Sequence, residues 1–487
     1  MSMLSTRQTP SFNSAGQLSG HAWATLLVLC GALFLDALDV SMIGVALPSI
    51  GADLGMSTSS LQWVVSGYVL GYGGFLLLGG RAADLLGRRR MFLISLGVFV
   101  VASGLGGLAN DGNLLIATRF IKGISAAFTA PAGLSIITTS FPEGAARNKA
   151  LSIYTAAGAT GFSLGLVFSG LLTEIGWRWT LFMPVPLALV TLIAAVRLVP
   201  DAGRPTRSSS FDPAGAISLT AAMLLLVYTV VEAPDAGWGS VRTIGSFALT
   251  GLILAAFVAI EQRSASPLVR LGILRSGSLV RANLGMMSLF AGWVGFQFIA
   301  VLYMQQLRDW SALETGLALF PGGLMVALLA PSLIPKLLMR FGVTRVILAG
   351  LSSAVVAYAL FLPIGLDSVY ATAMLPTFIF AGLAFALGYG PLSIAATNGI
   401  APEEQGLAGG LVNTSFQFGG ALGLAIVAAV NTANTGLDGS PQALMDGFEA
   451  ALIVPLVAAL LGVGVTALGL VRRAAPATAP QYIGADD

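Results

Sequence analysis

"GALFLDALDVSMIGVALPSI", residues 31–50, is apolar enough to cross a bilayer, yet it carries two carboxylates, Asp36 and Asp39. Apolar runs of about 20 residues recur along the whole chain, and this length crosses a hydrocarbon core of roughly 30 Å. Of the 487 residues, 56% are hydrophobic and 9% are charged. Soluble domains carry roughly 25% charged residues. The sequence therefore predicts an all-α membrane protein.

The apolar runs predict fourteen transmembrane helices. Lys and Arg concentrate in cytoplasmic loops, so their positions test this number. With a cytoplasmic amino terminus, 19 of the 24 Lys and Arg residues fall in cytoplasmic segments and three in outside loops. We therefore expect a multi-pass protein of the cell membrane with both termini in the cytoplasm. The helices are expected near 23–48, 61–80, 91–109, 114–137, 150–173, 179–199, 213–233, 243–261, 284–306, 313–335, 344–365, 371–394, 405–430 and 449–470.

Polar segments divide these helices into two groups of six and an inserted pair. Pro131 and Leu151 recur 260 residues later as Pro391 and Leu411, which supports two related halves. Transporters use such repeats to build a central cavity between two bundles that rock. The expected divisions are a tail (1–22), a six-helix bundle (23–199), a linker (200–212), two inserted helices (213–261), a cytoplasmic amphipathic segment (262–283), a second six-helix bundle (284–471) and a tail (472–487).

The composition excludes several kinds of site. His21 is the only histidine and Cys30 the only cysteine, so a histidine metal site and an internal disulfide cannot form. No P-loop occurs in the cytoplasmic segments, so we expect no nucleotide cofactor and no other cofactor. The net charge of +2 without a basic face gives no sign of nucleic acid. The expected partners are the lipid bilayer, a small organic substrate and protons, and we expect a monomer.

The segment GGRAADLLGRRR (79–90) joins the second and third predicted helices on the cytoplasmic side. Its glycines would allow close backbone approach and a tight turn. Its acid could pair with an arginine or face the positive end of a helix in the other half, forming a latch. Alternatively, the arginines only anchor the loop inside. The candidate gate residues are Gly80, Asp84, Gly87, Arg88 and Arg89.

These residues resemble the helix 2–3 signature of the major facilitator superfamily, G-x-x-x-D-R-x-G-R-R, with Leu85 in place of the first arginine. LDVSMIGVALP (38–48) is similar to the first-helix motif L-D-x-T-x-x-N-x-A-L-P of that superfamily's fourteen-helix drug:proton antiporters. RFIKG (119–123) resembles the helix 4 motif R-x-x-Q-G, with Lys122 where Gln is usual. The resemblance covers nearly the whole chain.

This resemblance implies the major facilitator fold of two six-helix bundles plus two inserted helices. It also implies alternating access, with export of drug-like or secondary-metabolite molecules in exchange for protons, as in multidrug efflux and antibiotic resistance. Proton-coupled uptake or lipid export by the same fold is the alternative. A membrane-embedded transferase is disfavoured, because such an enzyme needs a catalytic acid or base supported by further polar residues. A sensor would bind its ligand without flux.

The fifth predicted helix carries a glycine pattern similar to the antiporter motif, which usually ends G-P-x-x-G-G. Here the segment reads GLVFSG (165–170), with Leu166 for the proline and Ser169 for a glycine. A smooth glycine face still permits close helix packing. The kink that proline favours is absent, which weakens the case for antiport over another direction of coupling. The glycines of this motif are Gly158, Gly161, Gly165 and Gly170.

Helix geometry places four charges at matching depths in the membrane. At a rise of 1.5 Å per residue, Asp39 and Asp36 lie at the heights of Arg119 and Lys122 in the antiparallel fourth helix. We expect Asp39 to pair with Arg119 and Asp36 with Lys122. Charges inside the membrane are functional by default. The four are therefore candidates for proton coupling, with Asp39 first, although they could simply join the two helices.

Aromatic and amide side chains predict a bulky, amphipathic substrate. No acid outside the proposed cluster lies deep in a predicted span, so neutral or weakly charged molecules fit better than multiply charged cations. Each of these side chains could instead serve helix packing or the membrane interface. The cavity candidates are Gln62, Trp63, Tyr68, Trp293, Gln297, Tyr303, Asn413 and Gln417.

Asp39→Asn is predicted to abolish proton-driven transport, because an amide cannot bind and release a proton at this position. Gradient-driven efflux is the measurement, with the amount of folded protein in the membrane as its control. Unchanged efflux in this variant would exclude Asp39 from proton coupling.

Overall fold

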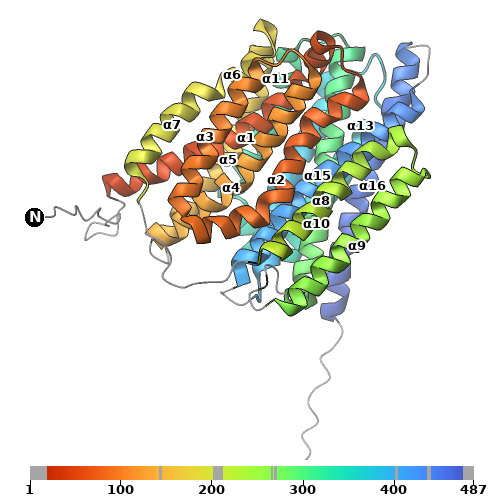
Figure 1. Cartoon of the computed structure of the whole chain (residues 1–487). Helices are drawn as coiled ribbons and strands as arrows, with labels where there is room; N and C mark the ends of the chain where they lie inside the picture. Colours follow the sequence, from red (N-terminus) through yellow and green to blue (C-terminus); the bar gives the residue numbers. More distant parts are fainter. Residues whose placement is uncertain are drawn as a thin grey trace, which may run out of the picture.

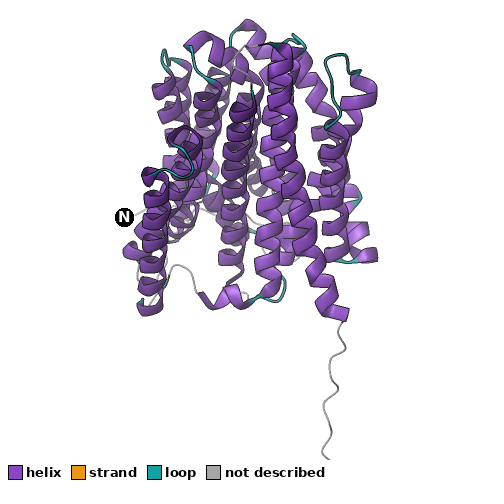
Figure 2. Ribbon diagram, turned by 90° about the vertical axis from the view of Figure 1, so that its right-hand side faces the viewer, coloured by secondary structure: helices purple, strands orange, loops and turns teal. Residues whose placement is uncertain are grey.

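The computed structural model describes residues 19–141, 145–200, 212–264, 267, 271–400, 404–435 and 440–474. Every regular element among these residues is a helix, as Figure 2 shows. Thirteen of the described helices are long and apolar enough to cross a membrane. The remaining predicted span, 61–80, lies within α2, a helix of 29 residues. The all-α membrane fold predicted from the apolar runs is confirmed.

The first half of the chain forms six spans (Figure 1). Helix α1 packs along α5, α2 along α4, and α3 against α4 and α7. The sixth span is divided at Met183, because Pro184 has no N–H for a helical hydrogen bond. The elements are α1 (Gly20–Leu54), α2 (Thr58–Leu86), α3 (Arg88–Gly107), α4 (Gly112–Ser140), α5 (Ala145–Ile175), α6 (Trp179–Phe182) and α7 (Pro184–Leu198).

The last part of the chain repeats this arrangement. Helix α15 begins 260 residues after α5, and Pro131 inside α4 corresponds to Pro391 inside α14. The repeated residues therefore lie in equivalent helices of the two halves. The elements are α10 (Gly277–Leu302), η2 (Tyr303–Leu307), α11 (Ala312–Ser332), α12 (Ile334–Phe341), α13 (Val343–Phe361), η3 (Tyr370–Met374), α14 (Leu375–Thr397), α15 (Gln405–Asn434) and α16 (Pro441–Ala474).

The inserted pair consists of α8 (Pro213–Ala236) and α9 (Val241–Arg263). Helix α8 packs against both α2 and α15, so it covers a line along which the two halves meet (Figure 1). Helix α9 packs against α8 and the short helix η1 (Leu271–Arg275). The expected amphipathic segment, 262–283, is shorter than predicted, because α10 already begins at Gly277. Residues 265–266 and 268–270 of that segment lie outside the described part.

The two halves pack together mainly at one end of the bundle. We call the end where α1 begins the N-side and the opposite end the far side. On the far side, one apolar core joins Ile43 and Leu47 of the first half with Phe298 of the second. Gln305 Nε2 also donates to the carbonyl of Val45 across the halves, at 2.9 Å. The far side is therefore closed by shared packing.

On the N-side each half has a core of its own. Leu26 and Phe92 belong to a cluster built only from the first half. Leu279 and Leu392 belong to a separate cluster built only from the second half. Apolar packing between the halves is therefore weaker on the N-side than on the far side.

Glycines allow α2 and α4 to touch backbone to backbone. A Cβ atom on Gly79 would lie 2.2 Å from the carbonyl oxygen of Ala127, closer than atoms can approach. A Cβ on Gly80 would lie 3.8 Å from Pro131 Cβ, an ordinary contact. The prediction that Gly80 permits close approach is wrong, because Gly79 has this role. Gly87 has φ 98° and forms the predicted tight turn between α2 and α3.

Gly79→Ala is predicted to destabilise the protein, because its methyl group would separate α2 from α4. Overpacking of this kind costs about 1–3 kcal/mol. Gly80→Ala is the matched control and should leave stability nearly unchanged. Thermal unfolding of both purified variants in detergent measures the difference, and equal melting temperatures would contradict the prediction.

Candidate functional site

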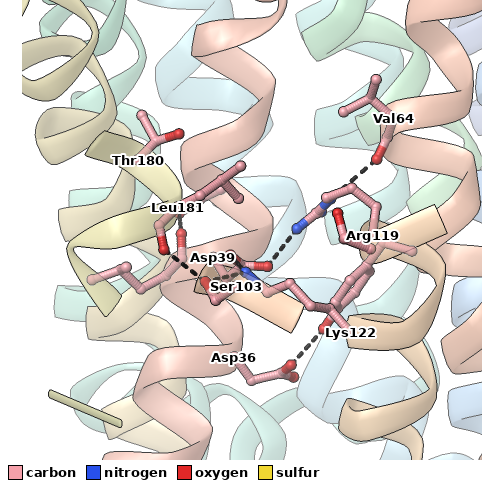
Figure 3. A network of polar contacts seen from close by, with 12 residues as sticks. Asp36, Asp39, Val64, Ser103, Arg119, Lys122, Thr180 and Leu181 are labelled. Atoms are coloured by element: carbon pink, nitrogen blue, oxygen red, sulfur yellow. Dashed lines mark hydrogen bonds and ion pairs between the residues drawn. The ribbon is translucent and has the colours of Figure 1, made fainter. Parts of the chain in front are cut away.

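A buried carboxylate on α1 is held by two cations from α4. Arg119 Nη1 donates to Asp39 Oδ2 at 2.5 Å, and Lys122 Nζ donates to Asp39 Oδ1 (Figure 3). All three side chains are at most 1% exposed. A spacing of three residues places both cations on one face of α4. The predicted contact between Asp39 and Arg119 is present.

The predicted pair of Asp36 with Lys122 is wrong. Lys122 contacts Asp39 and also donates to Ser103 Oγ at 2.9 Å. Asp36 accepts a hydrogen bond from the hydroxyl of Tyr68 on α2 (Figure 3). Matching residue heights could not find this arrangement, because the long lysine side chain reaches beyond its own height. The height comparison also used only the first and fourth helices, whereas the partner of Asp36 lies on the second.

Further hydrogen bonds attach this cluster to neighbouring helices. Arg119 Nε donates to the carbonyl of Val64 on α2 at 3.1 Å, and its guanidinium lies 4.7 Å from the centre of the Tyr68 ring. Ser103 on α3 donates to the carbonyl of Leu181 on α6 at 2.7 Å. The charged cluster, meaning Asp36, Asp39, Arg119 and Lys122, therefore connects five helices of the first half. Ser103 was missed because serine is common in membrane helices and no spacing distinguishes it.

A cavity lies between the halves, directly beside the charged cluster. Its volume is about 50 Å³. Two of the predicted substrate residues, Trp293 and Gln297 of α10, line it. Val40 also lines it, and its chain neighbour Asp39 belongs to the charged cluster. The full lining is Val40, Ile43, Gly44, Leu47, Val65, Phe162, Phe290, Trp293, Val294, Gln297, Phe298 and Leu424.

The walls of this cavity are apolar and aromatic. The Gln297 amide and the indole N–H of Trp293 are the polar side-chain groups among its lining residues. A Cβ on Gly44 would lie 3.2 Å from Gln297 Nε2, so the two halves approach closely here. Phe162 of α5 and Trp293 of α10 have ring centres 6.2 Å apart. Phe162 was missed because nothing in the sequence distinguishes it from the other 25 phenylalanines.

Four predicted substrate residues lie elsewhere. Tyr68 is buried against Asp36, and the Tyr303 hydroxyl donates to the carbonyl of Gly365 at 2.7 Å on the far side. Gln62 and Trp63 face the inserted helix α8. Gln62 Nε2 donates to the carbonyl of Val231 at 3.4 Å, and the Trp63 ring lies 5.9 Å from that of Tyr228. The assignment of these four residues to the cavity is wrong. For Gln62 and Trp63, the sequence does not indicate which face of α2 the inserted pair covers.

The two polar candidates on α15 are not among the lining residues of the central cavity. Asn413 Nδ2 donates to the carbonyl of Gly409 in its own helix, at 3.2 Å. Gln417 is buried in a smaller pocket between α2, α8 and α15, together with Gly73 and Thr414. Their assignment to the substrate cavity is therefore wrong as well.

The predicted gate residues are only partly described. Arg89 Nη2 donates to the carbonyl of Val196 in α7 at 2.7 Å, so it attaches the α2–α3 turn to its own half. The side chain of Asp84 lies outside the described part of the chain. The latch to the other half therefore stays a prediction, and Arg88 stays a candidate in it.

The glycines of α5 divide between two neighbours. A Cβ on Gly161 would lie 2.3 Å from the carbonyl oxygen of Phe34, and one on Gly165 would lie 2.7 Å from that of Leu38. Gly158 likewise faces α1, where its Cβ would lie 3.2 Å from the Leu33 side chain. The expected smooth face therefore packs on α1.

The last glycine of this motif contacts the other half of the chain. A Cβ on Gly170 would lie 2.7 Å from the carbonyl oxygen of Ala312, at the start of α11. Near the same point, the Leu313 N–H donates to Glu174 Oε1 at 3.3 Å. Gly170 and Glu174 therefore join α5 to α11 on the far side.

Comparison with known proteins identifies the family to which these features correspond. A model of the Major Facilitator Superfamily matches residues 29–424. The chain is 37% identical to the puromycin resistance protein pur8 of Streptomyces alboniger, over 87% of this chain and 86% of the relative. It is 36% identical to the cephamycin export protein CmcT of Amycolatopsis lactamdurans, over 91% of each. The nucleoside transporter NupG has a similar fold, with a TM-score of 0.66 at 14% identity, covering 91% of this chain and 99% of NupG.

The two cations are predicted to substitute partly for each other. Lys122→Met and Arg119→Leu each leave Asp39 one cation, whereas the double variant leaves it none. Because an unpaired buried charge costs about 3–5 kcal/mol, the double variant should lose more stability than the two single variants together. Thermal unfolding in detergent measures all three, and strictly additive losses would contradict the prediction.

Proposed function

The chain belongs to the major facilitator superfamily, and we propose that it exports drug-like or secondary-metabolite molecules across the cell membrane by proton antiport. The superfamily consists of transporters rather than enzymes. The puromycin and cephamycin proteins support export, because their names join antibiotics to resistance and to export. The observation that carries the antiport proposal is the buried charged cluster directly beside the central cavity.

The cavity supports a neutral or weakly charged substrate with aromatic or other apolar surface. Its lining carries no charged side chain, and its amide and indole groups can orient a ligand by hydrogen bonding. A multiply charged ligand would lose its hydration without gaining a charged partner there. In this proposal the substrate binds in the cavity and the proton binds in the charged cluster.

We place the N-side in the cytoplasm, because the Lys and Arg residues of the loops concentrate there. Closed packing on the far side then corresponds to a conformation that opens toward the cytoplasm, where a substrate for export is collected. The proton gradient supplies the energy, and the working unit is a monomer in the lipid bilayer.

The charged cluster supports coupling because its charges balance only in one protonation state. Two carboxylates and two cations are neutral together, and binding of one proton leaves a net charge of +1 inside the membrane. Such a charge is costly in a low-dielectric interior, so it favours a conformation that gives the cluster access to water. Proton binding and release can therefore bias the two access states.

A susceptibility and efflux panel in a pump-deficient bacterial host tests this proposal. Puromycin, tetracenomycin C and lincomycin are suitable first compounds, because relatives of this chain carry their names. Expression is expected to raise resistance to at least one compound severalfold and to lower its accumulation. A protonophore should restore accumulation, and efflux that persists in its presence would contradict proton coupling.

Two glutamine variants test the place of the substrate within the same panel. Gln297→Leu removes the cavity amide and should weaken efflux or change which compounds are exported. Gln62→Leu is the matched control, because Gln62 faces α8 and not the cavity. Equal effects of the two variants would contradict the assignment of the cavity.

A further inference from the structure

We propose that Asp36, paired with Tyr68, is the group that takes up and releases the proton, and that Asp39 remains a permanent anion. This inference rests on the proton coupling proposed above and names the side chain that performs it. It reverses the order expected from the sequence, in which Asp39 came first.

The hydrogen-bonding chemistry of the partners separates the two acids. Arginine and lysine side chains only donate hydrogen bonds, so Arg119 and Lys122 can satisfy Asp39 only as a carboxylate. A protonated Asp39 would direct its O–H at two cationic donors. A phenol both donates and accepts, so Tyr68 can donate to the Asp36 carboxylate and accept from the protonated acid. The Asp36 pair is therefore satisfied in both states.

Burial also differs between the two acids. Asp36 is 9% exposed, whereas Asp39 is 1% exposed. No cation among the described residues makes an ion pair with Asp36, and its hydrogen bond comes from a neutral group. The direct partner of Asp36 is therefore an uncharged hydroxyl group.

Other titratable groups near Asp36 lie on four helices, α1, α2, α4 and α5. The cations of α4 and the acid of its own helix act on it at longer range, and tyrosines of α2 and α5 also lie near it. Together, the two cations balance both acids when Asp36 is ionised, which opposes permanent protonation and makes release reversible. These groups are Asp39 on α1, Tyr68 and Tyr72 on α2, Arg119 and Lys122 on α4, and Tyr154 on α5.

The proton step involves one O–H bond and no other covalent change. A hydronium ion from water on the open side transfers its proton to a carboxylate oxygen of Asp36 and becomes water. The Tyr68 hydroxyl then turns from donor to acceptor. Because the Tyr68 ring lies 4.7 Å from the Arg119 guanidinium, this turn acts next to the ion pair of Asp39. Release on the other side reverses both changes.

Infrared difference spectroscopy of the full chain in lipid, between acidic and alkaline pH, tests the assignment without any substrate. A protonated carboxylic acid gives a carbonyl band that disappears on ionisation. We expect this band in the wild type, its loss in Asp36→Asn, and its replacement by a glutamic acid band in Asp36→Glu. Tyr68→Phe alters no charge and should shift the band, because the acid loses its hydrogen-bond partner.

Asp53→Asn is the matched control on the same helix, since Asp53 is exposed and lies beside Arg178. It should keep the pH-dependent band of the wild type. A band that persists unchanged in Asp36→Asn would overturn the inference, whatever the transport result. Failure of the wild type to export any compound would instead overturn the proposed function, because the infrared measurement does not require transport.

Discussion

The ion triad of Asp39 with Arg119 and Lys122 is the interaction on which the first half depends. Three charges in an apolar interior are tolerable only when they meet one another and their remaining hydrogen-bond groups find partners. Val64 and Ser103 supply those partners from α2 and α3. The positions of four helices of the first half are therefore tied to one carboxylate.

The sequence predicted the fold well because a bilayer leaves few alternatives. Apolar runs of the required length must become helices, and each predicted span was found, including the one that Pro184 divides. Boundaries were less accurate, as the earlier start of α10 shows. Helix ends lie where polar surroundings begin, and composition alone does not mark that point.

The site was predicted only where the heights of two helices decided the contact. Heights along two helices correctly placed Asp39 beside Arg119, but they could not show that Tyr68 belongs to Asp36. It was harder to predict which face of a helix points toward the cavity. Gln62 and Trp63 face α8, whereas Trp293 and Gln297 face the cavity. Rotation of a membrane helix depends on its neighbours, and a uniformly apolar sequence carries little amphipathic signal for it.

The inserted helices make the two lines of contact between the halves different from each other. On one side α5 meets α11 through bare glycines, as at Gly170, where sliding meets few side chains. On the other side α8 touches α2 and α15 at once, with Thr220 hydrogen-bonded to Gly74 of α2. Under the proposed alternating access, a half that moves must either carry α8 with it or slide past it, so we expect the inserted pair to hinder that movement on one face of the molecule only.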